Sequence, residues 1–114
     1  MNYTYPLKKN RDFKHVYSKG RSKVNRYFIM YAYENDMDHN RLGVSVSKKV
    51  GNSVIRHRIK RLVKESYRLH EKMFNSGLDI VVIARSGAAD LGYKNVESAL
   101  LHLLKLHNIY DGKY

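Results

Sequence analysis

The segment SKKVGNSVIRHRIKRLVKESYR, residues 47–68, carries the strongest structural signal in this chain of 114 residues. It contains eight lysines and arginines but a single acid, Glu65. Gly51 and Asn52 interrupt the chain, and residues 53–73 then repeat apolar side chains at the spacing of one helical face. The stripe expected to be buried is Ile55, Ile59, Leu62, Ser66, Leu69 and Met73. The sequence therefore predicts a long helix with one apolar face and one cationic face.

The cationic face of this helix is nearly uniform in sign. Arg56, Lys60, Lys64 and Arg68 repeat every four residues, and like charges at that spacing destabilise a free helix by a few tenths of a kcal/mol per pair. A solvated charged face is the usual explanation for lysine and arginine on a helix. Here phosphates would remove the repulsion, so the pattern favours contact with RNA or DNA.

Two segments before this helix read as strands. Residues 25–33 (NRYFIMYAY) are rich in aromatic and branched side chains and predict a strand. One face would carry Tyr27, Ile29, Tyr31 and Tyr33, and the other Phe28, Met30 and Ala32. After a polar turn at residues 34–40, residues 42–47 alternate. They predict an antiparallel partner strand with Val44 and Val46 in the core.

The ends of the chain add further elements. Asn10 is the expected cap of a short helix that contains Phe13 and Tyr17 and stops at Gly20. Residues 78–84 (LDIVVIA) predict a strand buried on both faces. Residues 93–107 predict an amphipathic helix that buries Val96, Leu100, Leu103, Leu104 and His107. The expected fold is one α/β (α+β) sandwich over residues 1–114, in the order α-β-β-α-β-α, with helices packed on a small mixed sheet.

Composition limits the partners. The net charge is +12, from 22 Lys and Arg against 10 Asp and Glu, and this sign suits nucleic acid or an anionic membrane. The longest apolar run, residues 80–84, is far too short to span a bilayer, so we expect no membrane partner. The chain lacks cysteine, which excludes a disulfide-linked partner and thiolate metal sites. Nothing near Met1 resembles a signal peptide, and a cytoplasmic location is the expectation.

Catalytic patterns are weak. The acidic residues Glu34, Asp36 and Asp38 lack the glycine and terminal glutamate of a calcium loop, so we expect a solvated turn and no metal site in the protein. The chain has six histidines, His15, His39, His57, His70, His102 and His107. A nuclease could use a pair of histidines, but none of these histidines has a partner at a sequence spacing that indicates a catalytic pair.

The aromatic side chains suggest a second RNA contact. Core packing explains some of them, but tyrosines opposite the core valines need another explanation. A groove with Tyr17 and Tyr31 on its floor, and with Ser45 and Ser47 as hydrogen-bond partners, would suit stacked bases of an unpaired strand.

Specific motifs place these features in a known family. The run Ser45-Val46-Ser47-Lys48-Lys49-Val50-Gly51-Asn52-Ser53-Val54, followed by Arg56-His57-Arg58-Ile59-Lys60-Arg61, resembles the signature of the protein subunit of bacterial ribonuclease P. Further matches are Asp12-Phe13 with Tyr17 and Gly20, Asn25-Arg26, and Val82-Ile83-Ala84-Arg85. The resemblance covers nearly the whole chain.

The resemblance implies a function. Proteins of this family bind a large catalytic RNA that removes the 5′ leader from precursor tRNA, with magnesium held mainly by the RNA and no catalytic residue in the protein. The implied leader-binding residues are Phe13, Tyr17, Ile29, Tyr31, Ser45, Ser47, His57 and Lys60. The implied contacts to catalytic RNA are Lys48, Lys49, Asn52, Arg56, Arg58, Arg61, Lys64 and Arg68. The family also suggests a left-handed crossover around the basic helix, against the usual right-handed rule.

One residue departs from the family pattern. His57 stands where the family motif has asparagine, and neutral imidazole offers a donor and an acceptor at a different reach. Two other functions stay open on the sequence alone: a non-catalytic RNA-binding module such as a ribosomal protein, and a nuclease that uses its own histidines.

Overall fold

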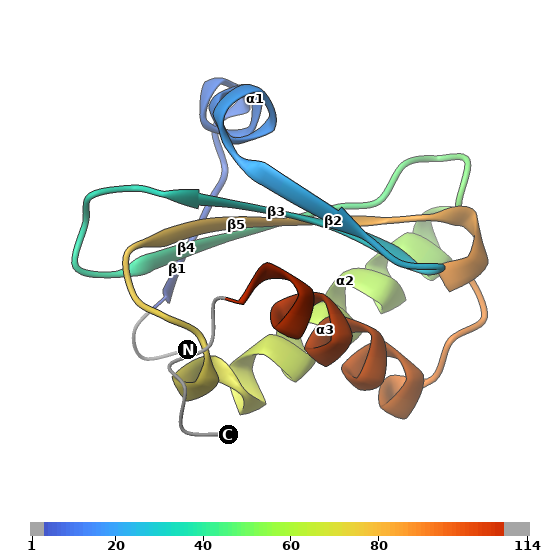
Figure 1. Cartoon of the computed structure of the whole chain (residues 1–114). Helices are drawn as coiled ribbons and strands as arrows, with labels where there is room; N and C mark the ends of the chain where they lie inside the picture. The colour runs from blue at the N-terminus through green and yellow to red at the C-terminus, as the bar shows by residue number, and fades with distance from the viewer. Residues whose placement is uncertain (1–3, 109–114) are drawn as a thin grey trace.

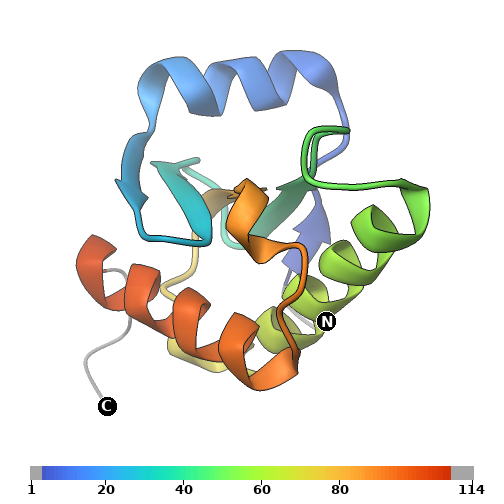
Figure 2. The same cartoon turned by 90° about the vertical axis from the view of Figure 1, so that its right-hand side faces the viewer.

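The computed structural model describes residues 4–108. Helices cover both faces of a five-stranded mixed sheet with the strand order β1-β4-β5-β3-β2 (Figure 1). The strands are β1 (Thr4–Pro6), β2 (Arg21–Val24), β3 (Phe28–Glu34), β4 (Asn40–Ser45) and β5 (Leu78–Ala84). The helices are α1 (Asn10–Lys19), α2 (Ser53–Leu69) and α3 (Tyr93–His107), with short 3-10 turns at Glu71–Met73 and Ser86–Ala88. Helix α1 lies over one face, whereas α2 and α3 lie side by side on the other (Figures 1 and 2).

The pairing of the strands corrects one prediction. Strand β4 pairs in parallel with β1 and β5, while β3 pairs antiparallel with β2 and β5. The predicted antiparallel pairing of residues 42–47 with residues 25–33 is therefore wrong, because β5 lies between them. Apart from Asp79, which Arg41 binds at 2.7 Å, strand β5 is apolar on both faces, and the central position buries both. The connection β4-α2-β5 is a parallel crossover, and the left hand expected for it stays a prediction.

Two strands at the edges of the sheet were not predicted. Strand β2 has the sequence RSKV with all four residues exposed, so it lacks the alternation that marks a strand with one buried face. Strand β1 has only three residues. Both owe their conformation to the neighbours with which they pair, and local sequence does not reveal such neighbours.

The larger core lies between the sheet and the pair α2 and α3. Predicted strand residues Phe28, Met30 and Ala32 are buried there, as are the predicted α3 residues. The α2 stripe is partly different from the prediction. Ile59 and Ser66 are buried and Ile55, Leu62 and Met73 are partly buried, but Leu69 is 56% exposed. Val63 and Tyr67 are buried instead, because α2 also packs against α3 and ends at Leu69.

The Tyr67 side chain explains how a polar group is accommodated in this core. Its hydroxyl group lies 2.8 Å from Thr4 Oγ1 of β1 and accepts a hydrogen bond from Asn40 Nδ2 of β4 at 3.2 Å. Buried polar groups of this kind are stable when they are hydrogen-bonded. Tyr67 therefore ties α2 to both strands.

A smaller core lies under α1. Leu7, Val16 and Val81 are buried there, with Phe13, Tyr31, Tyr33 and Ile83 packed against them. The predicted tyrosine face is thus partly a packing surface. Tyr27 does not share that face, because it precedes β3 and packs against the larger core.

The ends of the helices differ slightly from the prediction. Asn10 is the first residue of α1 and Lys9 is at the cap position, whereas α3 and β5 begin and end where predicted. Within residues 4–108, no helix has the length and apolar character needed to cross a bilayer.

Candidate nucleic-acid interface

A groove of about 370 Å³ opens where α1, the end of β4 and α2 meet. Helix α1 forms one wall and Lys60 of α2 stands on the other side. The lining residues are Asn10, Phe13, Lys14, Tyr17, Val44, Ser45, Val46 and Lys60. The structure therefore brings together Phe13, Tyr17, Ser45 and Lys60 from the residues that the family motifs suggested. Asn10 and Lys14 were not anticipated, although they lie one helical turn from Phe13 and Tyr17.

Gly43 of β4 allows α1 to lie close to the sheet. A Cβ atom at this position would lie 2.6 Å from the Phe13 Cζ atom and 2.8 Å from its Cε1 atom. No real side chain tolerates such a contact, so the Phe13 ring occupies the space that a side chain at residue 43 would need. This contact fixes the height of the α1 wall above the groove floor.

The aromatic rings of the groove contact one another. The Tyr17 ring centroid lies 5.0 Å from that of Tyr31 in an edge-on arrangement and 6.2 Å from that of Phe13. Tyr17 is 37% exposed. Burial raises the pKa of its phenol, a hydrogen bond with Ser45 partly offsets this, and Tyr31 adds to the increase. The Tyr17 hydroxyl group therefore stays protonated at neutral pH and can donate a hydrogen bond.

The strand register extends the groove floor across the sheet. Ser45 pairs with Ile83, and Ile83 pairs with Ile29. All three are half-buried and, with their strand neighbours, share the face covered by α1. Ile29 was predicted for this site. Ile83 was not, because the apolar sequence of β5 does not show which of its residues stay partly open.

Ser47 does not line this groove. It is exposed and lines a neighbouring hollow of about 360 Å³ at the end of the sheet. The other lining residues are Arg26, Lys49, Val50, Ala84, Arg85, Ser86 and Gly87. Strand β4 ends at Ser45, so the alternation predicted to carry Ser47 onto the groove floor does not continue that far.

The segment before α2 and its outer face are open to solvent. Lys48, Lys49, His57, Arg61 and Lys64 are exposed. Asn52 is exposed as well, and its side-chain oxygen accepts a hydrogen bond from the Ile55 backbone N–H at 3.0 Å. Asn52 thus caps the helix.

Three predicted arginines have contacts within the protein or are partly buried. Arg58 donates to the backbone carbonyls of Leu91 at 2.6 Å and Ala89 at 2.5 Å. Arg68 binds Glu65 through both carboxylate oxygens, at 2.5 and 3.1 Å. Arg56 is half-buried, and its Nε atom is buried without a hydrogen-bond partner among residues 4–108.

Histidine and acidic side chains are dispersed over the described residues. Within residues 4–108, no group of three histidine, aspartate or glutamate side chains gathers closely enough to hold a metal ion. His15, His39, His70, His102 and His107 each contact a residue other than histidine. His57 is exposed on α2.

Comparison with known proteins assigns the chain to a family. A family model described as Ribonuclease P matches residues 1–108. The chain belongs to the ribonuclease P protein family. Among its relatives, the ribonuclease P protein component of Lachnoclostridium phytofermentans is 55% identical over 103 residues, which are 90% of this chain and 89% of the relative. That of Clostridium botulinum strain Langeland is 53% identical over 106 residues, 92% of this chain and 96% of the relative.

Solved structures of ribonuclease P proteins share the fold. The Staphylococcus aureus protein superposes with a TM-score of 0.87 at 42% identity, covering 94% of this chain and 98% of that one. The Thermotoga maritima protein gives a TM-score of 0.82 at 35% identity, covering 89% and 96%. The chain is therefore a ribonuclease subunit of an RNA-containing complex, with the five-stranded mixed sheet of this family.

Proposed function

We propose that this chain binds the catalytic RNA of ribonuclease P and the single-stranded 5′ leader of precursor tRNA, and so promotes maturation of the tRNA 5′ end. The observation that carries the proposal is the groove in which Tyr17 and Ser45 lie beside Lys60. Aromatic rings stack on unpaired bases and a lysine neutralises their phosphates. The groove is open, as a strand that enters and leaves requires.

The exposure of the side chains supports an assignment of two RNA-binding surfaces. We assign the leader to the groove residues Phe13, Tyr17, Ser45 and Lys60, with Tyr31 and Ile29 continuing its floor. We assign the catalytic RNA to the exposed cations Lys48, Lys49, Arg61 and Lys64. The bonds from Arg58 to Leu91 and Ala89 support a different role for that residue, which is to hold α2 against the segment before α3.

In this proposal the RNA carries the chemistry. Magnesium supplies charge neutralisation for phosphodiester hydrolysis when it is bound to the RNA. The protein orients the leader and supplies positive charge around it. Both actions raise the affinity for the substrate and lower the magnesium concentration that the RNA needs.

Reconstitution tests this function. Precursor tRNA is incubated with the protein alone, with catalytic RNA alone, and with both, at low magnesium. We expect cleavage at the correct 5′ end only in the mixture. Failure of the protein to rescue the RNA would favour a plain RNA-binding module, and cleavage by the protein alone would favour a histidine-dependent nuclease.

A tyrosine pair tests the groove itself. Tyr17→Ala should weaken binding of precursor tRNA by ~1–3 kcal/mol, the usual value of one stacked base, and should leave mature tRNA almost unaffected. Tyr5→Ala is the matched control, because Tyr5 is 58% exposed and lies on β1, outside the groove. Equal losses of affinity for precursor and mature tRNA would contradict the assignment of the leader to the groove.

A further inference from the structure

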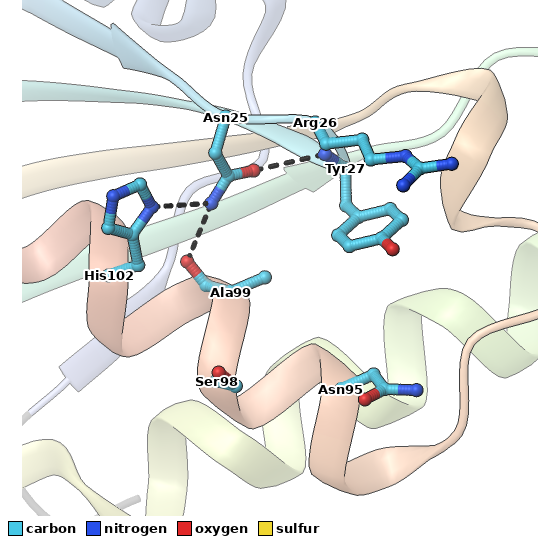
Figure 3. Close-up of a pocket in the computed structure, with 7 residues that line it drawn as sticks. All are labelled: Asn25, Arg26, Tyr27, Asn95, Ser98, Ala99 and His102. Atoms are coloured by element: carbon cyan, nitrogen blue, oxygen red, sulfur yellow. Dashed lines mark hydrogen bonds between the residues drawn. The ribbon is translucent and has the colours of Figure 1, made fainter.

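A second pocket lies on the other side of the sheet from the groove, between the β2–β3 turn and α3 (Figure 3). Its volume is about 370 Å³, within the range of about 300–1,000 Å³ that small-ligand sites occupy. It is lined by Asn25, Arg26, Tyr27, Asn95, Ser98, Ala99 and His102. The leader groove shares none of these residues.

Asn25 makes one side of the pocket rigid. Its side-chain oxygen accepts hydrogen bonds from the backbone N–H groups of Tyr27 and Phe28, at 3.0 and 2.9 Å. Its side-chain nitrogen lies 2.9 Å from the Ala99 carbonyl oxygen, to which it donates, and 3.3 Å from His102 Nδ1. With the amide oxygen occupied in this way, the nitrogen must face α3. Asn25 is fully used in shaping the turn and is a positioning residue for the pocket.

Other polar groups remain available to a ligand. Asn95, Ser98 and His102 lie on one face of α3 at the spacing of successive turns, and Figure 3 shows them along the same side of the helix. Within residues 4–108, neither the Asn95 amide nor the Ser98 hydroxyl group has a hydrogen-bond partner in the protein. An amide offers a donor and an acceptor together, which is the combination that the edge of a nucleobase presents.

An aromatic ring and a cation complete the pocket. Tyr27 is half-buried with its ring directed toward α3, and the Arg26 guanidinium carbon lies 5.5 Å from the ring centroid. Arg26 is exposed and, among the described residues, pairs with no carboxylate. Among the residues that the structure describes, no acidic side chain lines the pocket. Ring, amide, hydroxyl and unpaired guanidinium groups together match one nucleotide: a flat base, its polar edge and an anionic phosphate.

We propose that this pocket binds a single unpaired nucleotide of an RNA, with the base between Tyr27 and α3 and the phosphate at Arg26. The site adds a second RNA contact on the face of the molecule opposite the leader groove. It requires that the protein binds RNA, and it does not depend on what the groove holds.

Nuclear magnetic resonance of the whole ¹⁵N-labelled chain tests the proposal, with pentauridylate as the probe. The side-chain amide of Asn95 and the backbone amide of Tyr27 report on the pocket, and the backbone amide of Ser45 reports on the groove. We expect saturable shifts at Asn95 and Tyr27. Arg26→Gln should raise the dissociation constant measured from these signals by about tenfold, and Asn95→Ala should raise it by about fivefold.

Matched controls separate the pocket from general charge. Arg21→Gln removes the same charge from an exposed residue of β2 that does not line the pocket, and should change the constant by less than about twofold. Asn75→Ala removes an exposed asparagine near the start of β5, at the other end of the sheet, and should have no effect. Unchanged signals elsewhere verify that each variant is folded.

Three outcomes would overturn the inference. The first is that pentauridylate shifts neither the Asn95 nor the Tyr27 signal, and the second is that Arg26→Gln and Arg21→Gln lose the same affinity. The third is that inorganic polyphosphate displaces pentauridylate completely and itself causes no shift at Tyr27. The last result would reduce the pocket to a contact for anions. If pentauridylate shifts the Asn95 signal but not the Ser45 signal, the result counts against RNA binding in the leader groove and still supports RNA binding in the pocket.

Discussion

His57 is the residue at which this chain departs from the family motif, and it is exposed on α2. Imidazole holds its donor and its acceptor at a different reach from the side-chain amide of asparagine. We predict that His57→Asn changes the affinity for leader-bearing RNA and leaves the affinity for mature tRNA almost unaffected. Binding of precursor and mature tRNA to the two proteins checks this, and equal affinities of the two proteins for precursor tRNA would contradict it.

His107 gives a stability prediction with a definite sign. Its Nε2 atom donates to the Met30 carbonyl oxygen at 2.6 Å, and its Nδ1 atom is buried without a partner among residues 4–108. Burial lowers the pKa of His107, the bond to Met30 opposes this, and the charges of Arg21 and Lys23 lower the pKa further. As pH falls below the ordinary value of 6.5, the unfolded chain therefore takes up this proton before the folded chain does.

The free energy of unfolding should consequently decrease as pH falls through that window, by at most ~1.4 kcal/mol per pH unit from this one group. His107→Gln keeps an N–H donor at a similar reach and removes the titration. Urea unfolding at about pH 7.5 and 5.5 should show a smaller pH-dependent loss in His107→Gln. An identical loss in both proteins would assign the effect to other groups.

Gly43 links packing to the groove. In Gly43→Ala the new Cβ atom would overlap the Phe13 ring and press on Leu7 Cβ at 3.3 Å. We expect a loss of about 1–3 kcal/mol in the free energy of unfolding, as for other overpacked sites, together with weaker leader binding. Gly87→Ala is the control, since its nearest contact would be 3.5 Å, and it should change stability by less than about 0.5 kcal/mol. Equal stability of both variants would show that α1 shifts freely.

At the scale of elements, the N-terminus of α2 depends on one cap. Asn52→Ala removes the bond to the Ile55 N–H, and we expect a loss of about 1 kcal/mol in the free energy of unfolding. Asn52→Ser retains a capping oxygen and should recover most of it. Thermal or urea unfolding measures both. RNA binding that falls in both variants by the same amount would show a direct contact to RNA beyond the cap.

The elements predictable from sequence are those with a strong period of their own. Helix α3 and strand β5 lie where the pattern places them, and α2 begins at the predicted residue. The pairing of β4 was missed because it depends on β5, which follows β4 by more than thirty residues. The exposure of Leu69 was missed for a similar reason: the helical wheel assumes that α2 continues, and the 3-10 turn that ends it redirects the chain.

For the whole molecule, excess positive charge should dominate RNA affinity. If ~6 phosphates are neutralised, the logarithm of the binding constant should fall with the logarithm of salt concentration at a slope of about −4 to −5. Filter binding or fluorescence titration at several salt concentrations measures it. A slope near −1 for the cognate RNA would mean that the exposed cations of α2 do not contact phosphates.

The groove was more predictable than the pocket beside α3. The groove residues Tyr17, Ser45 and Lys60 lie within motifs that the family resemblance marks, whereas Ile83 becomes visible only once the strand register is known. The pocket joins a turn before β3 to residues of α3 about seventy positions later. No local sequence pattern predicts that this turn and α3 lie together, because only tertiary packing brings them into contact.

Strand β2 has a consequence for behaviour at high concentration. It is an edge strand of the sheet. Among residues 4–108 it pairs only with β3, so its outer backbone groups have no neighbouring strand in that part of the chain. An unpaired edge strand can pair with the edge strand of a second copy of the chain, which starts aggregation. Lysine and arginine side chains on the edge strand disfavour this pairing. Arg21 and Lys23 are both exposed on β2, so the charges that depress protonation of His107 also act as gatekeepers that keep copies of the chain from joining edge to edge.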